Sequence, residues 1–231
     1  MSLPIISQSS QGEVGLDLSL ERVQRIMSRH IPLYCRHKPN YQLELIGAFA
    51  ALWSPTYRRV LDVGGGTGII AQAMKDLFAV PHVVSIDVAD RFLPTLDIET
   101  RVYDGEALPF ADSSFDCVTF SNVLHHVHVD TRAHLLRECA RVLGDGPILI
   151  KDHLTSSALD HARLFALDAM GNLPFGGTIK ARYLDMAGWE ALAASCNRRI
   201  DACLGGRYRK GLFERLFPNR LEATLRLVPE L

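Results

Sequence analysis

Residues 60–68 read Val-Leu-Asp-Val-Gly-Gly-Gly-Thr-Gly, and this stretch decides the fold. Its apolar, largely β-branched start is typical of a strand buried in a parallel sheet. The strand ends at glycines in alternating positions, Gly64, Gly66 and Gly68. Because glycine tolerates positive φ and lets backbone approach a ligand closely, these positions predict a tight turn that presents main-chain N–H groups. Residues 69–78 then carry a helical pattern, so the unit is predicted to be strand, turn and helix.

A dinucleotide-binding turn, G-x-G-x-x-G, is the nearest alternative. Counted from Gly64, the third glycine would fall on Ile69; counted from Gly66, it would fall on Ala71, which the looser form of the motif allows. Spacing alone therefore leaves a nicotinamide dinucleotide open, as it does a plain glycine-rich turn. Asp62 counts against the dinucleotide, because a carboxylate there suits a ligand with a cationic amino acid part better than a pyrophosphate.

A second apolar run, residues 83–87, ends in Asp87, which falls 19 residues after Gly68. An acidic residue about 20 residues beyond such a turn, at the end of the second strand, meets ribose hydroxyls in nucleotide-binding folds. An ionised carboxylate accepts both hydroxyl donors of one ribose. The alternative is an ordinary turn or helix-capping aspartate.

The third block is Tyr-Asp-Gly-Glu-Ala-Leu-Pro-Phe at 103–110, followed by Asp-Ser-Ser-Phe-Asp-Cys-Val-Thr-Phe at 112–120. With these blocks in this order, the chain resembles the class I S-adenosylmethionine-dependent methyltransferase superfamily, in its type 11-like branch with small-molecule acceptors. The resemblance covers residues 60–152. It implies an α/β fold with a doubly wound, seven-stranded, mostly parallel Rossmann-like sheet, and S-adenosylmethionine as cofactor with S-adenosylhomocysteine as product.

The resemblance also implies which residues bind the cofactor. They surround the glycine turn, the end of the second strand, the adenine-side segment and the end of the fourth strand: Asp62, Gly64, Gly65, Gly66, Gly68, Asp87, Val88, Asp104, Gly105, Glu106, Ala107, Ser121 and Asn122. Asp104 is expected to accept a hydrogen bond from the adenine amine.

The candidate bases are histidines that follow predicted strands. His125 and His126 follow the fourth strand, and His153, beside Asp152, follows the fifth. Ligands of open α/β sheets bind at the carboxyl ends of strands, and the pKa of histidine suits proton transfer near neutral pH. Because Leu-His-His recurs in the family whatever the substrate, these two histidines are also expected to line the methionine end of the cofactor. His153 is the preferred base, and Trp189 is expected in the core.

The alternation of patterns predicts the following organisation. Residues 1–12 are expected to be disordered, 13–58 to form an N-terminal helical cap, and 59–231 to form the methyltransferase domain with a lid at 155–181. Strands are predicted at 59–63, 83–87, 100–103, 116–120, 148–150, 198–204 and 221–228, and helices at 19–30, 41–52, 68–78, 131–143, 159–170 and after Asp185. The lid is expected to bring Tyr34 and His37 against residues 170–175.

Composition narrows the function further. The 231 residues carry a net charge of −1, which gives no global attraction to nucleic acid. No apolar stretch is long enough for a membrane span and no secretory signal is visible, so a cytoplasmic protein is expected. Its five cysteines are scattered without C-x-x-C spacing, and no clustered Asp and Asn residues suggest a metal, so none is expected.

The leading hypothesis is methyl transfer to O or N of a small molecule; neither the acceptor nor the oligomeric state leaves a mark in residue spacing. A catalytically silent cofactor-binding module is an alternative, because no base is unambiguous. An RNA or protein methyltransferase is another, because residues 198–226 carry eight Arg or Lys against three acids. Such a mixture is more typical of the solvated side of an antiparallel hairpin, and the Asn/Asp-Pro-Pro-aromatic motif of those enzymes is absent.

Overall fold

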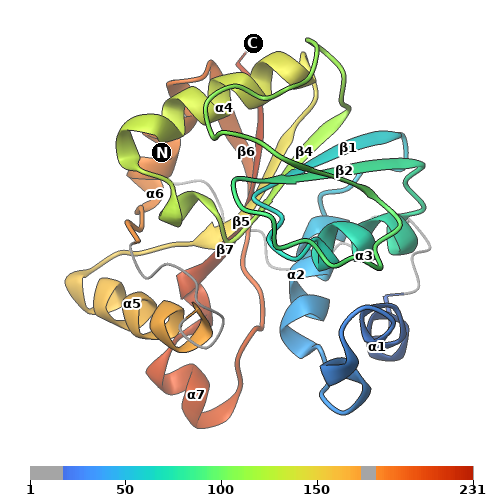
Figure 1. Cartoon of the computed structure of the whole chain (residues 1–231). Coiled ribbons are helices and arrows are strands. Elements are labelled where there is room, and N and C mark those ends of the chain that lie inside the picture. The colour runs from blue at the N-terminus through green and yellow to red at the C-terminus, as the bar shows by residue number, and fades with distance from the viewer. Residues whose placement is uncertain (1–17, 173–180, 231) are drawn as a thin grey trace.

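Seven strands form one sheet in the order β3-β2-β1-β4-β5-β7-β6 (Figure 1). The computed structural model describes residues 18–172 and 181–230. The first five strands run parallel, and β7 lies antiparallel between β5 and β6. The predicted doubly wound, mostly parallel sheet is confirmed. Its strands are β1 (Arg59–Val63), β2 (His82–Asp87), β3 (Glu99–Val102), β4 (Cys117–Ser121), β5 (Ile148–His153), β6 (Arg198–Leu204) and β7 (Glu222–Pro229).

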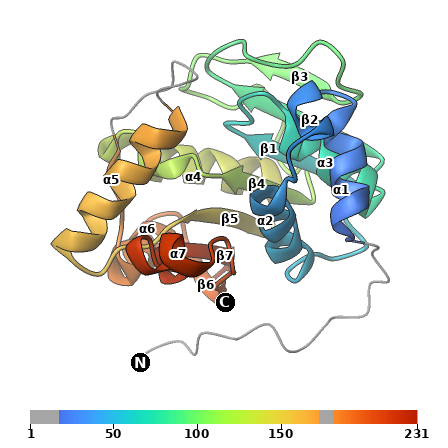
Figure 2. The same cartoon turned by 90° about the horizontal axis from the view of Figure 1, so that it is seen from below.

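Helices cover both faces of this sheet (Figures 1 and 2). Alternate residues of each strand serve the two layers, since side chains alternate between faces. Val60 packs on one side and Leu61 on the other. Trp189 is buried, as predicted, in the same cluster as Leu61. One layer holds α1 (Leu20–Ser28), α2 (Asn40–Ala50) and α3 (Ile69–Phe78); the other holds α4 (Val129–Leu143) and α6 (Met186–Ala194).

Two helix starts follow the predicted capping chemistry. The Ser19 side chain accepts a hydrogen bond from the amide of Arg22 at 3.3 Å, and the Asp185 side chain accepts one from Gly188 at 2.8 Å. Each cap satisfies an amide that the helix leaves unpaired and contributes about 1 kcal/mol.

The fifth strand is longer than its apolar run predicts. It continues through Lys151 and Asp152 to His153, because these residues pair with the start of β7, His153 opposite Glu222. The predicted strand at 148–150 therefore ends three residues too early, and His153 lies within the strand rather than after it. A short helix, α7 (Gly211–Leu216), also stands in the link between β6 and β7 where only turns are expected.

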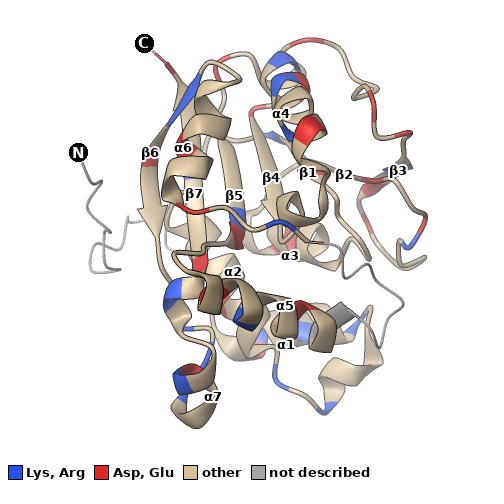
Figure 3. Cartoon of the chain, turned by 90° about the vertical axis from the view of Figure 1, so that its left-hand side faces the viewer, with Lys and Arg blue, Asp and Glu red and all other residues tan. Residues whose placement is uncertain are grey.

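The basic stretch 198–226 includes the antiparallel pair β6 and β7, and five of its eight basic residues are exposed, while Arg198 and Arg209 are buried. Arg198 donates to the carbonyl oxygens of Gly144 and Gly146, and Arg226 pairs with Asp201 at 2.8 Å. Arg220 binds Asp160 of α5 (Ala158–Asn172), and Arg209 binds Glu222. Positive and negative segments are interspersed on the face that Figure 3 shows. No helix in the described ranges has the length and apolarity of a membrane span.

Candidate functional site

The glycine turn is bonded to the end of β2. Gly64, Gly66 and Gly68 all have positive φ, at 73°, 58° and 76°, which explains why glycine recurs at alternate positions. The amide of Gly66 donates to Oδ2 of Asp87 at 2.8 Å, while Gly64 and Gly65 donate to the carbonyl of Ile86. The predicted turn and the predicted ribose-binding carboxylate are therefore in direct contact.

The turn is open to a ligand at one position. A Cβ atom placed on Gly64, Gly65 or Gly68 would lie within 2.5 Å of the nearest side-chain atom, from Val123, Ser85 and Leu96 respectively. A Cβ atom on Gly66 would have no described atom within 4 Å. Gly66 is therefore the point of the turn at which a bound molecule has room to approach the backbone.

Asp62 lies beneath this turn. Only 1% of its surface is exposed, and its carboxylate accepts hydrogen bonds of 2.9 Å from both Ser85 and Thr119. Burial raises the pKa of Asp62 to about 6, although these two hydrogen bonds act in the opposite direction. The sequence places Asp62 against a cationic ligand; the structure instead gives it hydroxyl partners on the strands that flank β1.

The adenine-side residues meet at the carboxyl ends of β2 and β3. Val88 is 61% exposed, and its Cγ1 would lie 3.4 Å from a Cβ on Gly105. Asp104 is exposed and accepts a hydrogen bond from the amide of Glu106 at 2.9 Å, which shapes this turn. Ala107 is exposed as well. An apolar side chain thus faces solvent beside a carboxylate, an arrangement that suits a flat heteroaromatic ring with an exocyclic amine.

The end of β4 contacts a buried lysine that the sequence did not single out. Lys151 is fully buried, and its ammonium donates to the Tyr41 hydroxyl at 2.6 Å, to Asn122 Oδ1 at 2.7 Å and to Glu222. Asn122 has a φ of 58°, uncommon for a residue with a side chain, and also donates to Tyr41 at 2.9 Å. The neighbouring hydroxyl of Ser121 is buried without a hydrogen-bond partner in the described part of the chain.

All three predicted histidines come together with two carboxylates and a tyrosine. We call this group the histidine cluster: His125, His126, Asp152, His153, Asp168 and Tyr183. The ring centroids of His125 and His126 are 4.0 Å apart, and those of His125 and His153 are 4.8 Å apart. The two elements that complete it are α5, which carries Asp168, and the segment before α6, which carries Tyr183.

Carboxylates hold the histidines in place. Nδ1 of His125 lies 2.5 Å from Asp152 Oδ1, and its Nε2 lies 3.4 Å from Asp168 Oδ2. His153 has Asp168 at 3.4 Å from Nε2 and Glu222 at 3.2 Å from Nδ1. Each of these two imidazoles therefore stands between two acids.

The pKa values of the acids follow from the same contacts. Burial alone would raise the pKa of Asp152, but the His125 imidazole, its hydrogen bond and His153 hold it well below its usual range. Burial likewise opposes the shift at Asp168, where His153, His125 and Tyr183 lower the pKa. Burial and the neighbouring Asp168 raise the pKa of Tyr183, whose hydroxyl donates to that carboxylate. The carboxyl groups of Asp152 and Asp168 are therefore ionised near neutral pH.

The predicted lid is described only in part. Residues 173–180 lie outside the described residues, as do 1–17. Figures 1 and 2 show α1 and α5 on opposite sides of the molecule. The expected contact of Tyr34 and His37 with residues 170–175 stays a prediction, because residues 173–175 lie outside the described ranges. Tyr41 of α2, rather than Tyr34, reaches the strand ends.

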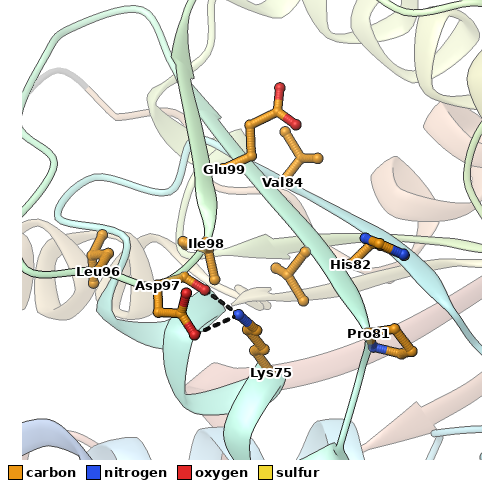
Figure 4. Close-up of a pocket in the computed structure, with 9 residues that line it drawn as sticks. Lys75, Pro81, His82, Val84, Leu96, Asp97, Ile98 and Glu99 are labelled. Atoms are coloured by element: carbon orange, nitrogen blue, oxygen red, sulfur yellow. Dashed lines mark hydrogen bonds and ion pairs between the residues drawn. The ribbon is translucent and has the colours of Figure 1, made fainter.

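A cavity of about 300 Å³ lies elsewhere, between α3 and the first residues of β2 and β3 (Figure 4). It is lined by Lys75, which pairs with Asp97 at 2.8 Å, and by His82 and Glu99. His82 and Asp87 are the first and last residues of β2, so this cavity is at the opposite end of the strand from the glycine turn. Because open α/β sheets bind ligands at carboxyl ends, we do not assign it to the cofactor.

Comparisons with known proteins agree with this geometry. Residues 61–150 match the family model described as a methyltransferase domain. A malonyl-[acyl-carrier protein] O-methyltransferase of Coxiella burnetii is 35% identical over 91 residues, which are 39% of this chain and 32% of that protein. A ubiquinone/menaquinone biosynthesis C-methyltransferase of Hahella chejuensis is 34% identical over 144 residues, 54% of this chain and 57% of that protein. The matches thus span about half the length of such relatives or less.

Solved structures share the fold. The YcgJ protein of Bacillus subtilis superposes with a TM-score of 0.57 at 19% identity, covering 83% of this chain and 98% of that one. A chain from the complex between the Haloferax volcanii Trm112 methyltransferase activator and a methyltransferase gives 0.66 at 15% identity, covering 92% and 97%. At these identities the likeness concerns the fold alone.

Proposed function

The chain belongs to the class I S-adenosylmethionine-dependent methyltransferase superfamily, and we propose that it methylates a hydroxyl group of a small-molecule acceptor. One observation carries the proposal. The glycine turn, bonded to Asp87 and open at Gly66, lies at the same sheet edge as the histidine cluster. A nucleotide-type binding turn and a group of acid–base side chains thus face one region.

The residues present fit the cofactor. Asp87 is the ribose acceptor, Val88, Asp104, Gly105, Glu106 and Ala107 receive the adenine, and the turn 64–68 approaches the backbone of the ligand. Ser121, with its unpartnered hydroxyl, and Asn122 line the methionine end. S-adenosylmethionine, when bound, supplies an activated methyl group on a sulfonium.

The chain then has to align the acceptor and remove a proton. We assign the proton to the imidazole of His153, which has Asp168 at 3.4 Å from Nε2 and Glu222 at 3.2 Å from Nδ1. This ring would take the O–H proton of the acceptor when its oxygen receives the methyl group. The carboxylates of Asp168 and Glu222 flank the imidazolium that forms and stabilise it.

The hydroxyl is favoured over an amine by the candidate base. A neutral amine attacks a sulfonium methyl without losing a proton first, so His125 and His153, each held between two acids, would have no required role in an N-methyltransferase. Four of the eight basic residues that suggested the nucleic-acid alternative bind carbonyls and carboxylates of the protein itself, which counts against that alternative.

Calorimetry with S-adenosylmethionine and S-adenosylhomocysteine tests the first half of the proposal. No detectable affinity for either compound would contradict it. Mass spectrometry of reactions with a panel of phenols, alcohols and carboxylic acids then measures S-adenosylhomocysteine formation. Binding without product across the whole panel would support the silent cofactor-binding module instead.

A further inference from the structure

Two hydrogen-bond acceptors face each other inside the histidine cluster. The Asp152 carboxylate accepts from the backbone amide of His153 at 2.7 Å, and an ionised carboxylate has no proton to give. Nδ1 of His125, 2.5 Å from Asp152, must therefore be the donor in that pair. In a neutral imidazole this leaves a lone pair on Nε2.

No described residue donates a hydrogen bond to this lone pair. His125 is 3% exposed, and its Nε2 atom has no hydrogen-bond partner in the described part of the chain. The charged atom opposite, Asp168 Oδ2, is 3.4 Å away and already accepts from Tyr183. Two acceptors at this distance repel each other unless a positive charge lies between them.

We propose that His125, His126 and Asp168 bind a divalent transition-metal ion. One ligand atom from each residue lies within 4.8 Å of the other two. Ligands about 2.0–2.1 Å from a tetrahedral ion are about 3.3 Å apart, and the 3.4 Å between His125 Nε2 and Asp168 Oδ2 matches that edge.

The surroundings of the three ligands match a metal site as well. A metal-binding histidine commonly donates its other ring N–H to a carboxylate, which fixes the ring and its tautomer; Asp152 does this for His125. Tyr183 in turn donates to Asp168. Two imidazoles and one carboxylate favour Zn²⁺ or a similar ion over Mg²⁺ or Ca²⁺, which prefer oxygen ligands.

Three protein ligands leave a fourth position for water or substrate. In that position the ion would bind the acceptor oxygen and lower its pKa, with His153 beside it to take the proton. This role rests on the proposed function, whereas the metal site itself does not. No metal is expected from the sequence, which has neither C-x-x-C spacing nor clustered Asp and Asn residues, and Asp168 is far from both histidines along the chain.

The test uses the full-length chain after dialysis against a chelator. Calorimetry measures binding of Zn²⁺, Mn²⁺ and Co²⁺ separately, and the visible spectrum of the Co²⁺ form reports its coordination. We expect one ion per chain, with affinity at least about ten-fold lower in His126→Gln, Asp168→Asn and Asp152→Asn. His161→Gln is the matched control, since His161 is exposed, contacts the same Tyr183 ring and is outside the ligand set.

The outcomes separate clearly. Absence of saturable binding for all three ions overturns the proposal. Equal metal affinity in His126→Gln and His161→Gln overturns it as well. Either result would assign the charge between His125 and Asp168 to a proton. Circular dichroism checks the fold of each variant. If Asp168→Asn does not fold, the metal affinity of His126→Gln decides the test, because His126 is only half-buried. Cofactor calorimetry is run separately, so metal binding without S-adenosylmethionine binding would leave this inference standing and remove the proposed function.

Discussion

The amide of Gly66 and the carboxylate of Asp87 are joined by a hydrogen bond of 2.8 Å, which fixes the turn after β1 to the end of β2. Asp87 also accepts from the amide of Ala89 at 3.0 Å and lies 3.4 Å from the guanidinium of Arg91. A carboxylate offers about four acceptor positions. Asp87 therefore shapes the turn and still has capacity for hydroxyl donors of a ligand.

Asp87→Ala is expected to weaken S-adenosylmethionine binding by about 1.5–3 kcal/mol, roughly 10- to 150-fold, because hydrogen bonds to a charged group are lost. Calorimetry measures the change. Asp112→Ala is the control, since it removes an exposed carboxylate that pairs with Arg141 and precedes β4. Wild-type affinity in Asp87→Ala would mean that the second strand was misaligned with the family.

Gly66→Val is expected to abolish detectable cofactor binding while the sheet still forms. The new side chain would fill the open space at the turn, and a φ of 58° is strained for a β-branched residue. Gly205→Val is the matched control, because its Cβ also has no described atom within 4 Å and its φ is not positive. Circular dichroism reports the fold and calorimetry the binding; cofactor affinity retained by the Gly66 variant would be incompatible with the proposed approach of the ligand.

Asp62 gives a pH dependence of stability. Its folded pKa of about 6 lies above the ordinary 3.8, so the folded state holds this proton more tightly than the unfolded chain. The stabilising contribution is present in full below about pH 3.8 and is lost as the pH rises through 6. A shift of this size corresponds to about 3 kcal/mol at most, at 1.36 kcal/mol per pKa unit.

Asp62→Asn removes this titration. Urea unfolding at pH 7 and pH 5 is expected to show that wild type gains stability relative to Asp62→Asn at the lower pH. The pKa values of Asp152 and Asp168 are lowered, so their contribution to the stability of the folded protein is lost as the pH falls. Both residues are present in wild type and in Asp62→Asn, so this contribution cancels in the difference. A difference independent of pH would show that Asp62 is ionised throughout this range.

His153→Ala is expected to lower turnover at least about ten-fold with little change in S-adenosylmethionine affinity, because general-base catalysis contributes on the order of 10²–10⁴-fold. Single-turnover kinetics with a true acceptor measures the first quantity and calorimetry the second. His161→Gln serves again as the control outside the site. An unchanged rate would leave alignment of the two substrates to explain transfer.

The parts of this structure that the sequence predicts are those specified locally. Positive φ at alternate positions requires glycine, so the turn at 64–68 is visible in the chain itself. The strand that ends at Asp87 and the strand that ends just before Asn122 are largely apolar because both faces of a parallel sheet are covered. The caps at Ser19 and Asp185 are local in the same sense.

The rest depends on contacts between distant residues. Lys151, Asp152 and His153 look like a polar loop, and only pairing with the start of β7 makes them a buried strand. Asp168 and Tyr183 lie in segments without a recognisable motif, yet they complete the histidine cluster. No local pattern singles out Tyr41, because its partners are distant in the sequence: Asn122 follows β4 and Lys151 lies in β5.

The position of β7 also sets the order in which the protein can be completed on the ribosome. Glu222, the first residue of β7, supplies the carboxylate between Lys151, Arg209 and His153, and it is synthesised after all three. A nascent chain that ends before Glu222 lacks the carboxylate that pairs with the Lys151 ammonium. Burying Lys151 in β5 is therefore unfavourable until Glu222 has been synthesised. The acid–base edge can therefore reach its native arrangement only after β7 has been synthesised and has inserted between β5 and β6.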